Sequence, residues 1–290
     1  MNKIILFFTV VFMSGCVHHS IHPDTIRDSF VLVKKKTTIN VCGGENKTTV
    51  CKKLMDFGSV GSGAVVHNER ALMKDPRTLI LTANHVCQTD KVTLANLGPG
   101  VIPHIKDNLK LNPPYSLEII NEMKVQNQFG RNFVVKNRPW IQNEQADTCV
   151  IETSMSAPSL KIGTLPEFGD ELYNIAAPKG IFHSSSSGGG VFFTKGSYNG
   201  RFLMDKNKLF AMYSINAAPG SSSSPVLNKD GELIGMIHSV DSRFCSRIEP
   251  ICHSIVSYGA TRKQVVDTIK GALSAIRRGK PAQFDYKQIQ

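Results

Sequence analysis

Short runs of apolar or alternating residues recur along most of the chain, and glycine, proline and asparagine separate them. Runs of this length, bounded by turn-forming residues, are typical of β-strands. The turn at 228–231 (Asn-Lys-Asp-Gly) predicts a hairpin, because Gly231 can adopt the positive φ that such turns require. We predict strands within 60–66, 78–81, 91–97, 118–129, 133–136, 148–153, 172–176, 190–194, 209–214, 225–227, 233–238 and 254–258.

The C-terminal region has the one clear helical period. Apolar residues recur there every three or four positions, at Val265, Ile269, Leu273 and Ile276. Thr261 and Gln264 have the spacing of a capping box, which predicts that a helix begins after Thr261. We expect a helix over 262–277 and a basic, polar tail over 278–290. Many short strands followed by one helix predict an all-β fold built from barrels or sandwiches.

Composition agrees with a globular β protein. The 290 residues are 41% hydrophobic, 8% aromatic and 20% charged, which argues against intrinsic disorder, collagen and a protein that spans the membrane several times. The formal net charge is +11, but the basic residues are scattered along the chain and do not alternate with aromatic residues. The charge therefore indicates a basic solvated surface, and we expect no nucleic-acid partner.

The N-terminus has the pattern of an export signal. Lys3 precedes the apolar run 4–13, which is too short to span a bilayer and suits a signal peptide over 1–15. The run ends in Met-Ser-Gly-Cys, which resembles the bacterial lipobox and makes Cys16 the expected lipidation site. The alternative is a signal peptide without lipid. We expect an exported lipoprotein anchored to a bacterial membrane and facing the periplasm or the cell surface.

The remaining cysteines fit an oxidising compartment. If Cys16 carries lipid, six of the seven cysteines remain, and six allow 15 pairings. Two pairs, Cys42 with Cys51 and Cys245 with Cys252, would each close a short loop. No Cys-x-x-Cys spacing occurs, and the histidines at 18, 19 and 22 lie in a polar tether without a preorganised surrounding. We therefore expect neither a metal nor a cofactor.

Two segments carry candidate chemistry. Residues 82–85 read Thr-Ala-Asn-His directly after an apolar run, and residues 220–225 read Gly-Ser-Ser-Ser-Ser-Pro between two apolar runs. These segments resemble the histidine box and the nucleophile loop of chymotrypsin-like serine proteases. The histidine-box resemblance assigns His85, and the loop resemblance assigns Ser222. The sequence departs from the loop pattern at Ser223, where the family has glycine. A flexible serine linker is the alternative, which the flanking strands disfavour.

A catalytic histidine needs a carboxylate that orients its ring and stabilises its cation. Asp147 is the only candidate that opens an apolar run. The segment 147–151 that it begins resembles the strand that carries the catalytic aspartate in the same family. The order His85, Asp147, Ser222 is that of chymotrypsin-like enzymes and differs from those of subtilisins and α/β-hydrolases. The candidates for this carboxylate are Asp90, Asp107, Asp147, Asp170 and Asp205.

The resemblance covers about 61–276 and implies two antiparallel β-barrels with a C-terminal helix. It implies that Ser222 attacks a peptide carbonyl, His85 carries the proton and Asp147 orients His85. The amides of Gly220 and Ser222 would form the oxyanion hole. The domains expected are 1–15 signal peptide, 16–55 tether and N-terminal extension, 56–158 first barrel, 159–277 second barrel with the helix, and 278–290 tail.

Substrate binding is expected along the strand 235–239. His238 resembles the histidine with which glutamate-specific relatives bind an acidic side chain, and Ser239 follows it; a structural histidine is the alternative.

Two function classes remain open. The first is an active, lipid-anchored serine endopeptidase whose partner is a protein or peptide substrate. The second is an inactive or weakly active binding module, which Ser223 and Ala177 allow because the family has glycine at both positions.

Overall fold

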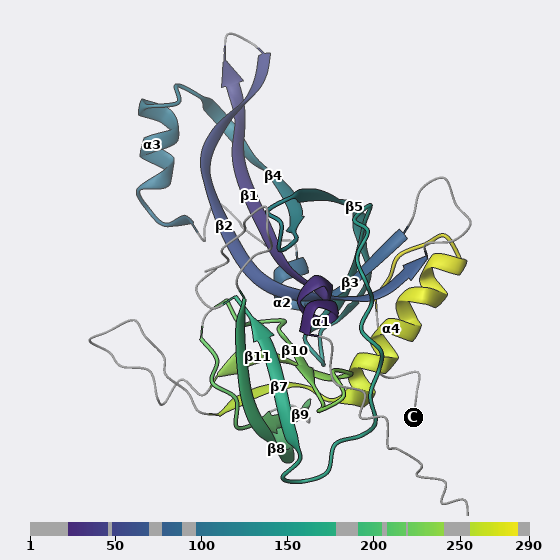
Figure 1. Cartoon of the computed structure of the whole chain (residues 1–290). Coiled ribbons are helices and arrows are strands. Elements are labelled where there is room, and N and C mark those ends of the chain that lie inside the picture. The colour runs from purple at the N-terminus through teal and green to yellow at the C-terminus, as the bar shows by residue number, and fades with distance from the viewer. Residues whose placement is uncertain are drawn as a thin grey trace, which may run out of the picture.

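The computed structural model describes residues 23–45, 48–69, 77–88, 97–177, 191–204, 208–218, 220–240 and 256–283 (Figure 1). Its helices are α1 (Pro23–Ser29), α2 (Asn84–Cys87), α3 (Val101–Asp107) and α4 (Arg262–Arg277). The strands are β1 (Phe30–Glu45), β2 (Thr48–Glu69), β3 (Arg77–Ala83), β4 (Asn112–Gln126), β5 (Asn132–Asn143), β6 (Thr148–Thr153), β7 (Glu171–Ala176), β8 (Phe192–Met204), β9 (Lys208–Tyr213), β10 (Pro225–Leu227), β11 (Leu233–Val240), β12 (Ser257–Ala260) and β13 (Ala282–Gln283). Within the described residues, no helix is long and apolar enough to cross a membrane.

The first half of the chain, together with β13 from the C-terminal end, forms a sheet with the strand order β13-β5-β4-β1-β2-β3-β6. An additional pairing between β5 and β6 closes the six strands β5-β4-β1-β2-β3-β6 into a barrel. Among the described strands of this sheet, β13 alone runs parallel to its neighbour. Alternate residues of these strands face inward, as the period of a half-buried strand requires. The enclosed core contains Val31, Val33, Val65, Ile80 and Ile151.

The second half closes into a barrel with the order β10-β11-β12-β9-β8-β7. Its separate core contains Leu172, Tyr213, Val226, Ile234 and Ile237. The prediction of an all-β protein with two antiparallel barrels and a C-terminal helix is confirmed. Chain segments 89–96 and 241–255, which include parts of two predicted strands, lie outside the described residues.

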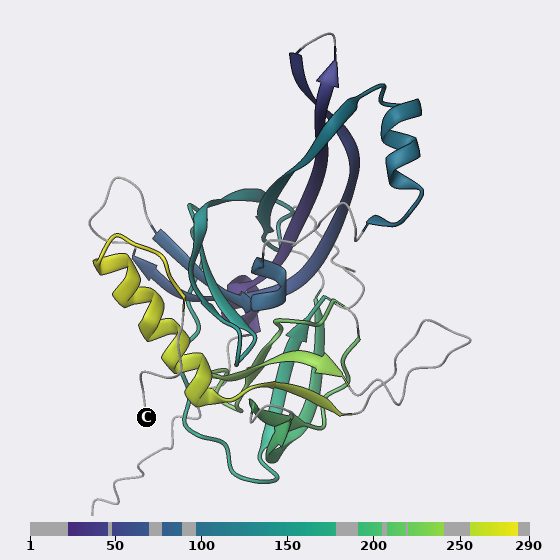
Figure 2. The ribbon, with the colours of Figure 1, turned by 180° about the vertical axis from the view of Figure 1, so that it is seen from behind.

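The C-terminal helix α4 packs where the two barrels meet (Figure 2). It begins with the predicted capping box, in which the Thr261 side chain accepts a hydrogen bond from the Gln264 amide and the Gln264 side chain accepts one from the Thr261 amide. Val265 and Ile269 belong to a cluster that also contains Leu81 from the first sheet and Met236 from the second. The helix therefore contributes to the interface that fixes one barrel against the other.

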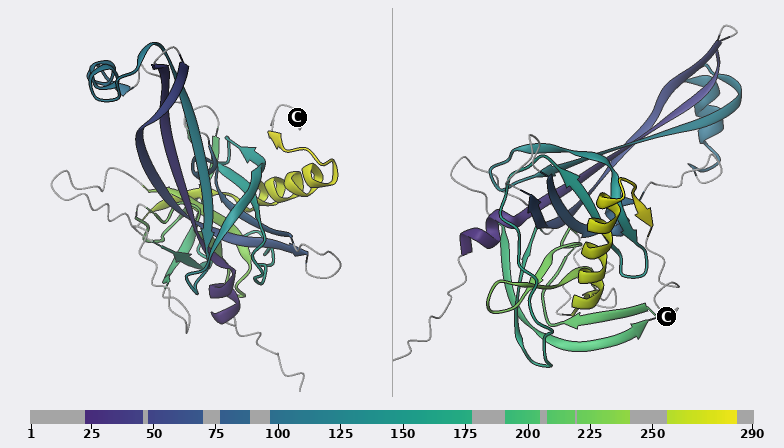
Figure 3. Two further views of the ribbon diagram at one scale, coloured as in Figure 1. Left: turned by 90° about the horizontal axis from the view of Figure 1, so that it is seen from above. Right: turned by 90° about the vertical axis from the view of Figure 1, so that its right-hand side faces the viewer.

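An arm extends from the first barrel (Figure 1, Figure 3). Beyond the barrel, residues 36–45 of β1 pair only with 48–58 of β2 and 112–122 of β4, because β3 joins β2 at 64–69 and β5 joins β4 at 124–126. We call these three segments together with α3 the arm. A small core of Val41, Ile105 and Leu111 lies inside it, and the Cys42–Cys51 disulfide crosses it.

The arm changes one predicted boundary. The sequence placed 16–55 outside the first barrel, whereas the structure puts β1 in the middle of its sheet. Every second residue of β1 is buried, but two of these inward positions are Lys35 and Thr37, with exposures of 5% and 1%. Because they are polar, the alternation that identifies a strand is interrupted in the sequence.

Candidate active site

The pairing of β3 with β6 brings two predicted site residues together. Ala83, the last residue of β3, lies opposite Thr148, the first residue of β6. Since the two strands are antiparallel, the residues after Ala83 and before Thr148 leave the sheet at the same edge. His85 therefore lies in α2 beside Asp147, and the Asn84 amide donates a hydrogen bond to the Asp147 carbonyl at 3.0 Å.

The His85 and Asp147 side chains form a hydrogen-bonded pair. His85 Nδ1 lies 2.7 Å from Asp147 Oδ2, and the His85 amide donates to Asp147 Oδ1 at 2.9 Å. The hydrogen bond with Asp147 raises the pKa of His85, although partial burial opposes the shift. A proton held on Nδ1 leaves Nε2 as the acceptor, which is the tautomer that a general base requires.

Hydrogen bonds from α4 support the turn that carries Asp147. The residue has a positive φ of 48°, an uncommon conformation for an aspartate that its surroundings must stabilise. Asn143 Oδ1 accepts the Ala146 amide at 3.1 Å, and Asn143 Nδ2 donates to Thr268 Oγ1 of α4 at 3.2 Å. The Thr148 and Thr268 hydroxyls also lie 2.8 Å apart. The helix predicted from periodicity thus contacts the turn before β6.

The predicted nucleophile lies in the loop before β10, next to the His–Asp pair. Ser222 Oγ donates a hydrogen bond to the carbonyl of His238 at 3.3 Å, and within the described part of the chain it makes none with His85. The ring of that same His238 lies beside Asp147. The structure therefore gathers all three predicted residues at one place, with His85 and Asp147 joined directly and the Ser222 hydroxyl directed to a backbone acceptor.

Ser62 holds the nucleophile loop against the first barrel. Its amide donates to the Ser222 carbonyl at 2.7 Å, and its hydroxyl donates to the Gly220 carbonyl at 3.1 Å. The Ser222 amide donates to no acceptor among the described residues. Gly220 has a φ of 94°, a conformation that glycine adopts without strain. Ser62, in the Gly-Ser-Gly segment 61–63, was not predicted as a functional residue from the sequence.

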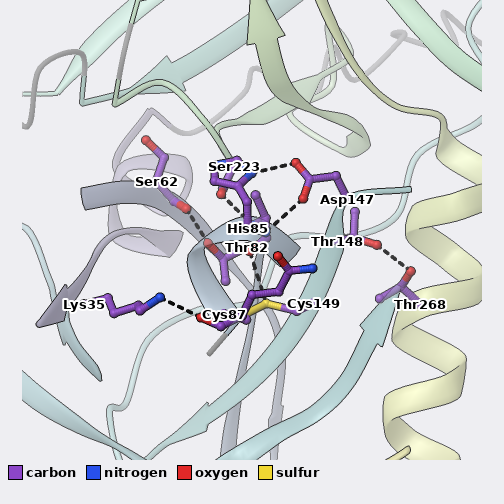
Figure 4. The surroundings of a disulfide bond; sticks show 12 residues. Lys35, Ser62, Thr82, His85, Cys87, Asp147, Thr148, Cys149, Ser223 and Thr268 are labelled. Carbon is purple, nitrogen blue, oxygen red and sulfur yellow. Dashed lines mark hydrogen bonds and ion pairs between the residues drawn. A yellow bond between two sulfur atoms is a disulfide. The ribbon is translucent and has the colours of Figure 1, made fainter. Parts of the chain in front are cut away.

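Ser223, where the family has glycine, is accommodated by a hydrogen bond. Its φ is 74°, which costs an ordinary residue about 1–2 kcal/mol. Its buried hydroxyl accepts a hydrogen bond from the Ala83 amide at 2.5 Å, and its own amide donates to the Ile237 carbonyl at 2.6 Å. The extra hydroxyl thus connects the nucleophile loop to the residue that precedes α2 (Figure 4).

The His238 side chain faces Asp147 and is 10% exposed. Its Nδ1 lies 3.6 Å from Asp147 Oδ2, and its ring centroid is 4.7 Å from that of Phe210. Its buried Nε2 has no hydrogen-bond partner among the described residues. Burial lowers the pKa of His238 to about 4, so the ring is neutral at neutral pH. The predicted contact with an acidic substrate needed a protonated ring, and this surrounding disfavours protonation. Ser239 follows on β11, partly buried and opposite Tyr258.

Two disulfides occur in the described chain. Cys42–Cys51 is the short-loop pair expected from the sequence, whereas Cys87–Cys149 joins residues 62 positions apart and was not anticipated. Cys42, Cys51 and Glu118 have metal-ligating atoms close together, but the two sulfur atoms are bonded to each other and offer no thiolate. Cys16, Cys245, Cys252 and the histidines of the tether lie outside the described residues.

The other candidate aspartates lie away from the His85–Asp147 pair or outside the described residues. Asp107 ends α3 on the arm, and Asp170 accepts the Glu167 amide at 2.8 Å before β7. Asp90 and Asp205 lie outside the described residues. Ala177 is buried, and its amide donates to Ser62 Oγ at 3.4 Å, so this non-glycine position contacts the residue that holds the nucleophile loop.

Two of three comparisons with known proteins give a match. The sequence model of the family described as "Trypsin-like peptidase domain" matches residues 61–236, a range that contains His85, Asp147 and Ser222. Comparison with curated proteins gives no match. A solved structure titled "HtrA-type protease AlgW with decapeptide" has a TM-score of 0.55 at 15% identity, with 91% of this chain and 69% of that chain covered. At that identity the likeness shows the fold, which is chymotrypsin-like.

Proposed function

The chain belongs to the trypsin-like peptidase family, and from this premise we propose that it is a serine endopeptidase with the triad Ser222, His85 and Asp147. One observation carries the proposal. His85 Nδ1 is hydrogen-bonded to Asp147 at 2.7 Å beside the loop that presents Ser222. This arrangement leaves His85 Nε2 available for a hydroxyl proton, which is the requirement for activating a serine.

In the proposed first step, the Ser222 hydroxyl turns from the His238 carbonyl toward His85 Nε2. As Oγ attacks the peptide carbonyl, its proton passes to Nε2, and the carbonyl electrons move to the oxygen. The imidazolium is stabilised by the Asp147 carboxylate. The amides of Gly220 and Ser222 would donate to the oxyanion. Support for this role comes from Ser62, which binds the Gly220 and Ser222 carbonyls and so orients the peptides of the loop.

In the second step, the proton on His85 Nε2 passes to the leaving amine, and the carbon–nitrogen bond breaks. The acyl group stays on Ser222 until water, deprotonated by the same nitrogen, releases the acid. A protein or peptide is the proposed substrate. Ser239 stays our candidate for contact with the substrate backbone. We do not extend the proposal to acidic side chains, because burial keeps His238 neutral.

A binding module without hydrolytic activity is the second candidate function. It is favoured by the hydrogen bond from Ser222 Oγ to the His238 carbonyl and by the positive φ of Ser223. In such a protein the same loops would hold a peptide without attacking it. The two candidates differ in the reactivity of Ser222, because only an activated hydroxyl beside a working oxyanion hole reacts rapidly with a phosphonylating reagent.

A fluorophosphonate probe distinguishes the two candidates. We expect the exported chain to be labelled rapidly and to cleave casein, and Ser222→Ala to lose both properties while keeping its far-UV circular dichroism. Ser59→Ala, a change at an exposed serine of β2, is the matched control and should be labelled like the wild type. Absence of labelling and of hydrolysis in the wild type would favour the binding module. Equal hydrolysis by wild type and Ser222→Ala would remove Ser222 as the nucleophile.

We also propose that Cys16 carries a lipid that anchors the exported chain to a bacterial membrane. The support is the apolar run over 4–13 and the Ser-Gly-Cys that follows it. The disulfides of the described chain agree with an oxidising compartment. Cys16→Ser should move the protein from the membrane pellet to the soluble exported fraction. A variant that stays in the pellet after a high-salt wash would contradict the lipid anchor.

A further inference from the structure

We propose that the Cys87–Cys149 disulfide positions the His85–Asp147 pair, and that its reduction by a dithiol converts the site to a state of low activity. This inference rests on the proposed peptidase function. The disulfide lies directly beneath the pair (Figure 4). Cys87 is two residues after His85 in α2, and Cys149 is two residues after Asp147 in β6. One covalent link therefore connects the two short segments that present the imidazole and the carboxylate.

The segment that carries His85 depends on such links. The helix α2 has four residues, and its N-cap Ala83 provides no side-chain hydrogen bond. A single turn of this kind is unstable by itself, so contacts with the rest of the protein must hold it. Its N-terminal end is held by the hydrogen bonds from the Asn84 and His85 amides to Asp147. Its C-terminal end is held by the disulfide and by Lys35 Nζ, which donates to the Gln88 carbonyl at 2.6 Å.

The other end of the link lies in a rigid part of the sheet. Cys149 is fully buried opposite Thr82, and its sulfur lies 3.4 Å from the Ala83 carbonyl oxygen. Both cysteines belong to the core cluster that also contains Val86 and Met155. In a close-packed interior, two sulfur atoms that are no longer bonded must move apart to a non-bonded separation. The displacement, on the order of 1 Å, passes to α2 because β6 is held by strands on both sides.

The chemistry is ordinary thiol–disulfide exchange. A dithiol reductant supplies two electrons and two protons, the Cys87–Cys149 bond breaks, two thiols form, and the reductant becomes a disulfide. Cys87, 5% exposed, is more accessible than Cys149, which is 0% exposed. Misplacement of a catalytic group by about 1 Å lowers activity by about 10²-fold, which sets the size of the expected effect.

The Cys42–Cys51 disulfide provides a matched control. It joins residues that lie directly opposite each other in β1 and β2, on the arm. We therefore compare Cys87→Ala combined with Cys149→Ala, the site pair, with Cys42→Ala combined with Cys51→Ala, the arm pair. In the full exported chain, kcat/KM for a peptide substrate should fall about 10²-fold in the site pair and stay unchanged in the arm pair.

Reduction of the unaltered chain is the second measurement and does not depend on folding of the site pair. Dithiothreitol should lower kcat/KM in the wild type and in the arm pair, and reoxidation should restore it. In a folded site pair, dithiothreitol should cause no further loss. The proposal is overturned if the site pair keeps wild-type kcat/KM, or if the reduced wild type stays fully active after mass spectrometry has shown that Cys87 and Cys149 are free thiols.

A titration of His85 shows whether the disulfide positions the His85–Asp147 pair or only stabilises the fold. It also distinguishes failure of this proposal from failure of the proposed peptidase function. The charged and titratable groups around the ring are Asp147 and Lys35, with His238 behind Asp147. In ¹⁵N-histidine NMR spectra, assigned with His85→Ala, the pKa of His85 should fall toward its ordinary value when the disulfide is lost. An unchanged titration would overturn the proposal. A wild type without hydrolysis, in which the disulfide still sets the His85 pKa, would overturn the peptidase function alone.

Discussion

The arm and the His85–Asp147 pair both belong to the first barrel, and each has one disulfide. In the arm, Cys42 and Cys51 face each other across one hairpin, nine positions apart in sequence. At the site, Cys87 and Cys149 connect α2 to β6 across 62 positions. The first bond reinforces a pairing that neighbouring residues already form. The second joins two segments that only the folded sheet brings together, so the same chemistry serves local stability in one region and functional geometry in the other.

The polar groups of the two regions differ in the same way. Arm charges such as Lys53 and Asp56 form an exposed pair 3.3 Å apart, the kind of contact that contributes little to stability. Site groups bond to partners far along the chain, including His85 with Asp147 and the Ser223 hydroxyl with the Ala83 amide. We expect substitutions in the arm to change stability and substitutions of the His85–Asp147 pair to change activity. Four experiments test this contrast.

The largest effect is expected when a carboxylate becomes an amide at the site. Asp147→Asn should lower kcat on the order of 10⁴-fold, as for the triad aspartate of chymotrypsin-like enzymes, because the ring would lose its tautomer and the stabilisation of its cation. Glu118→Gln, the same chemical change on the arm, should leave kcat unchanged. Steady-state kinetics on one peptide substrate compares kcat of the two variants. Equal losses of kcat in both would contradict the difference in role that we assign to the site and the arm.

The pH dependence of kcat/KM tests the role of Asp147 in a second way. His85 accepts a proton only when neutral, and Asp147 raises its pKa above the ordinary 6.5. Wild-type kcat/KM should therefore fall as the pH drops through a value above 6.5, and Asp147→Asn should move this acid limb to lower pH. A raised pKa also means that the His85 contribution to stability is present below pH 6.5 and is lost as the pH rises through the folded-state pKa.

A moderate effect is expected from the arm disulfide. Its loss frees a loop with a sequence separation of nine, and chain entropy then lowers the free energy of unfolding by about 2.6 kcal/mol. Denaturant unfolding of Cys42→Ala combined with Cys51→Ala measures this change, while kcat should stay at the wild-type value. A loss of kcat with unchanged stability would reverse the roles assigned to the two regions.

The smallest effect is expected at Ser223. Replacement by glycine relieves the strain of the positive φ, about 1–2 kcal/mol, but leaves the buried Ala83 amide without its acceptor, at about 1–3 kcal/mol. Because the two changes oppose each other, Ser223→Gly should alter the free energy of unfolding by about 1 kcal/mol or less and retain labelling by a fluorophosphonate. Ser223→Ala keeps the strain and loses the acceptor, so thermal unfolding should show it to be the less stable of the two.

Local patterns in the sequence determined much of this protein. Alternating apolar residues predicted most strands, the period and capping box predicted α4 with its bounds at Arg262 and Arg277, and the two motifs with one aspartate selected the residues that the fold gathers. The Cys42–Cys51 pair was also among the expected ones. Each of these features depends on residues close together in the chain, where spacing and side-chain type decide the structure.

The tertiary structure decided the rest. It buries Lys35 and Thr37 inside a strand, turns His238 toward Asp147, gives Ser223 a hydrogen-bonded role and joins Cys87 to Cys149. All four outcomes depend on which residue from a distant strand or loop lies opposite. The spacing of residues along the sequence does not predict these contacts. The register between β3 and β6 and the packing of one barrel against the other depend on the whole core.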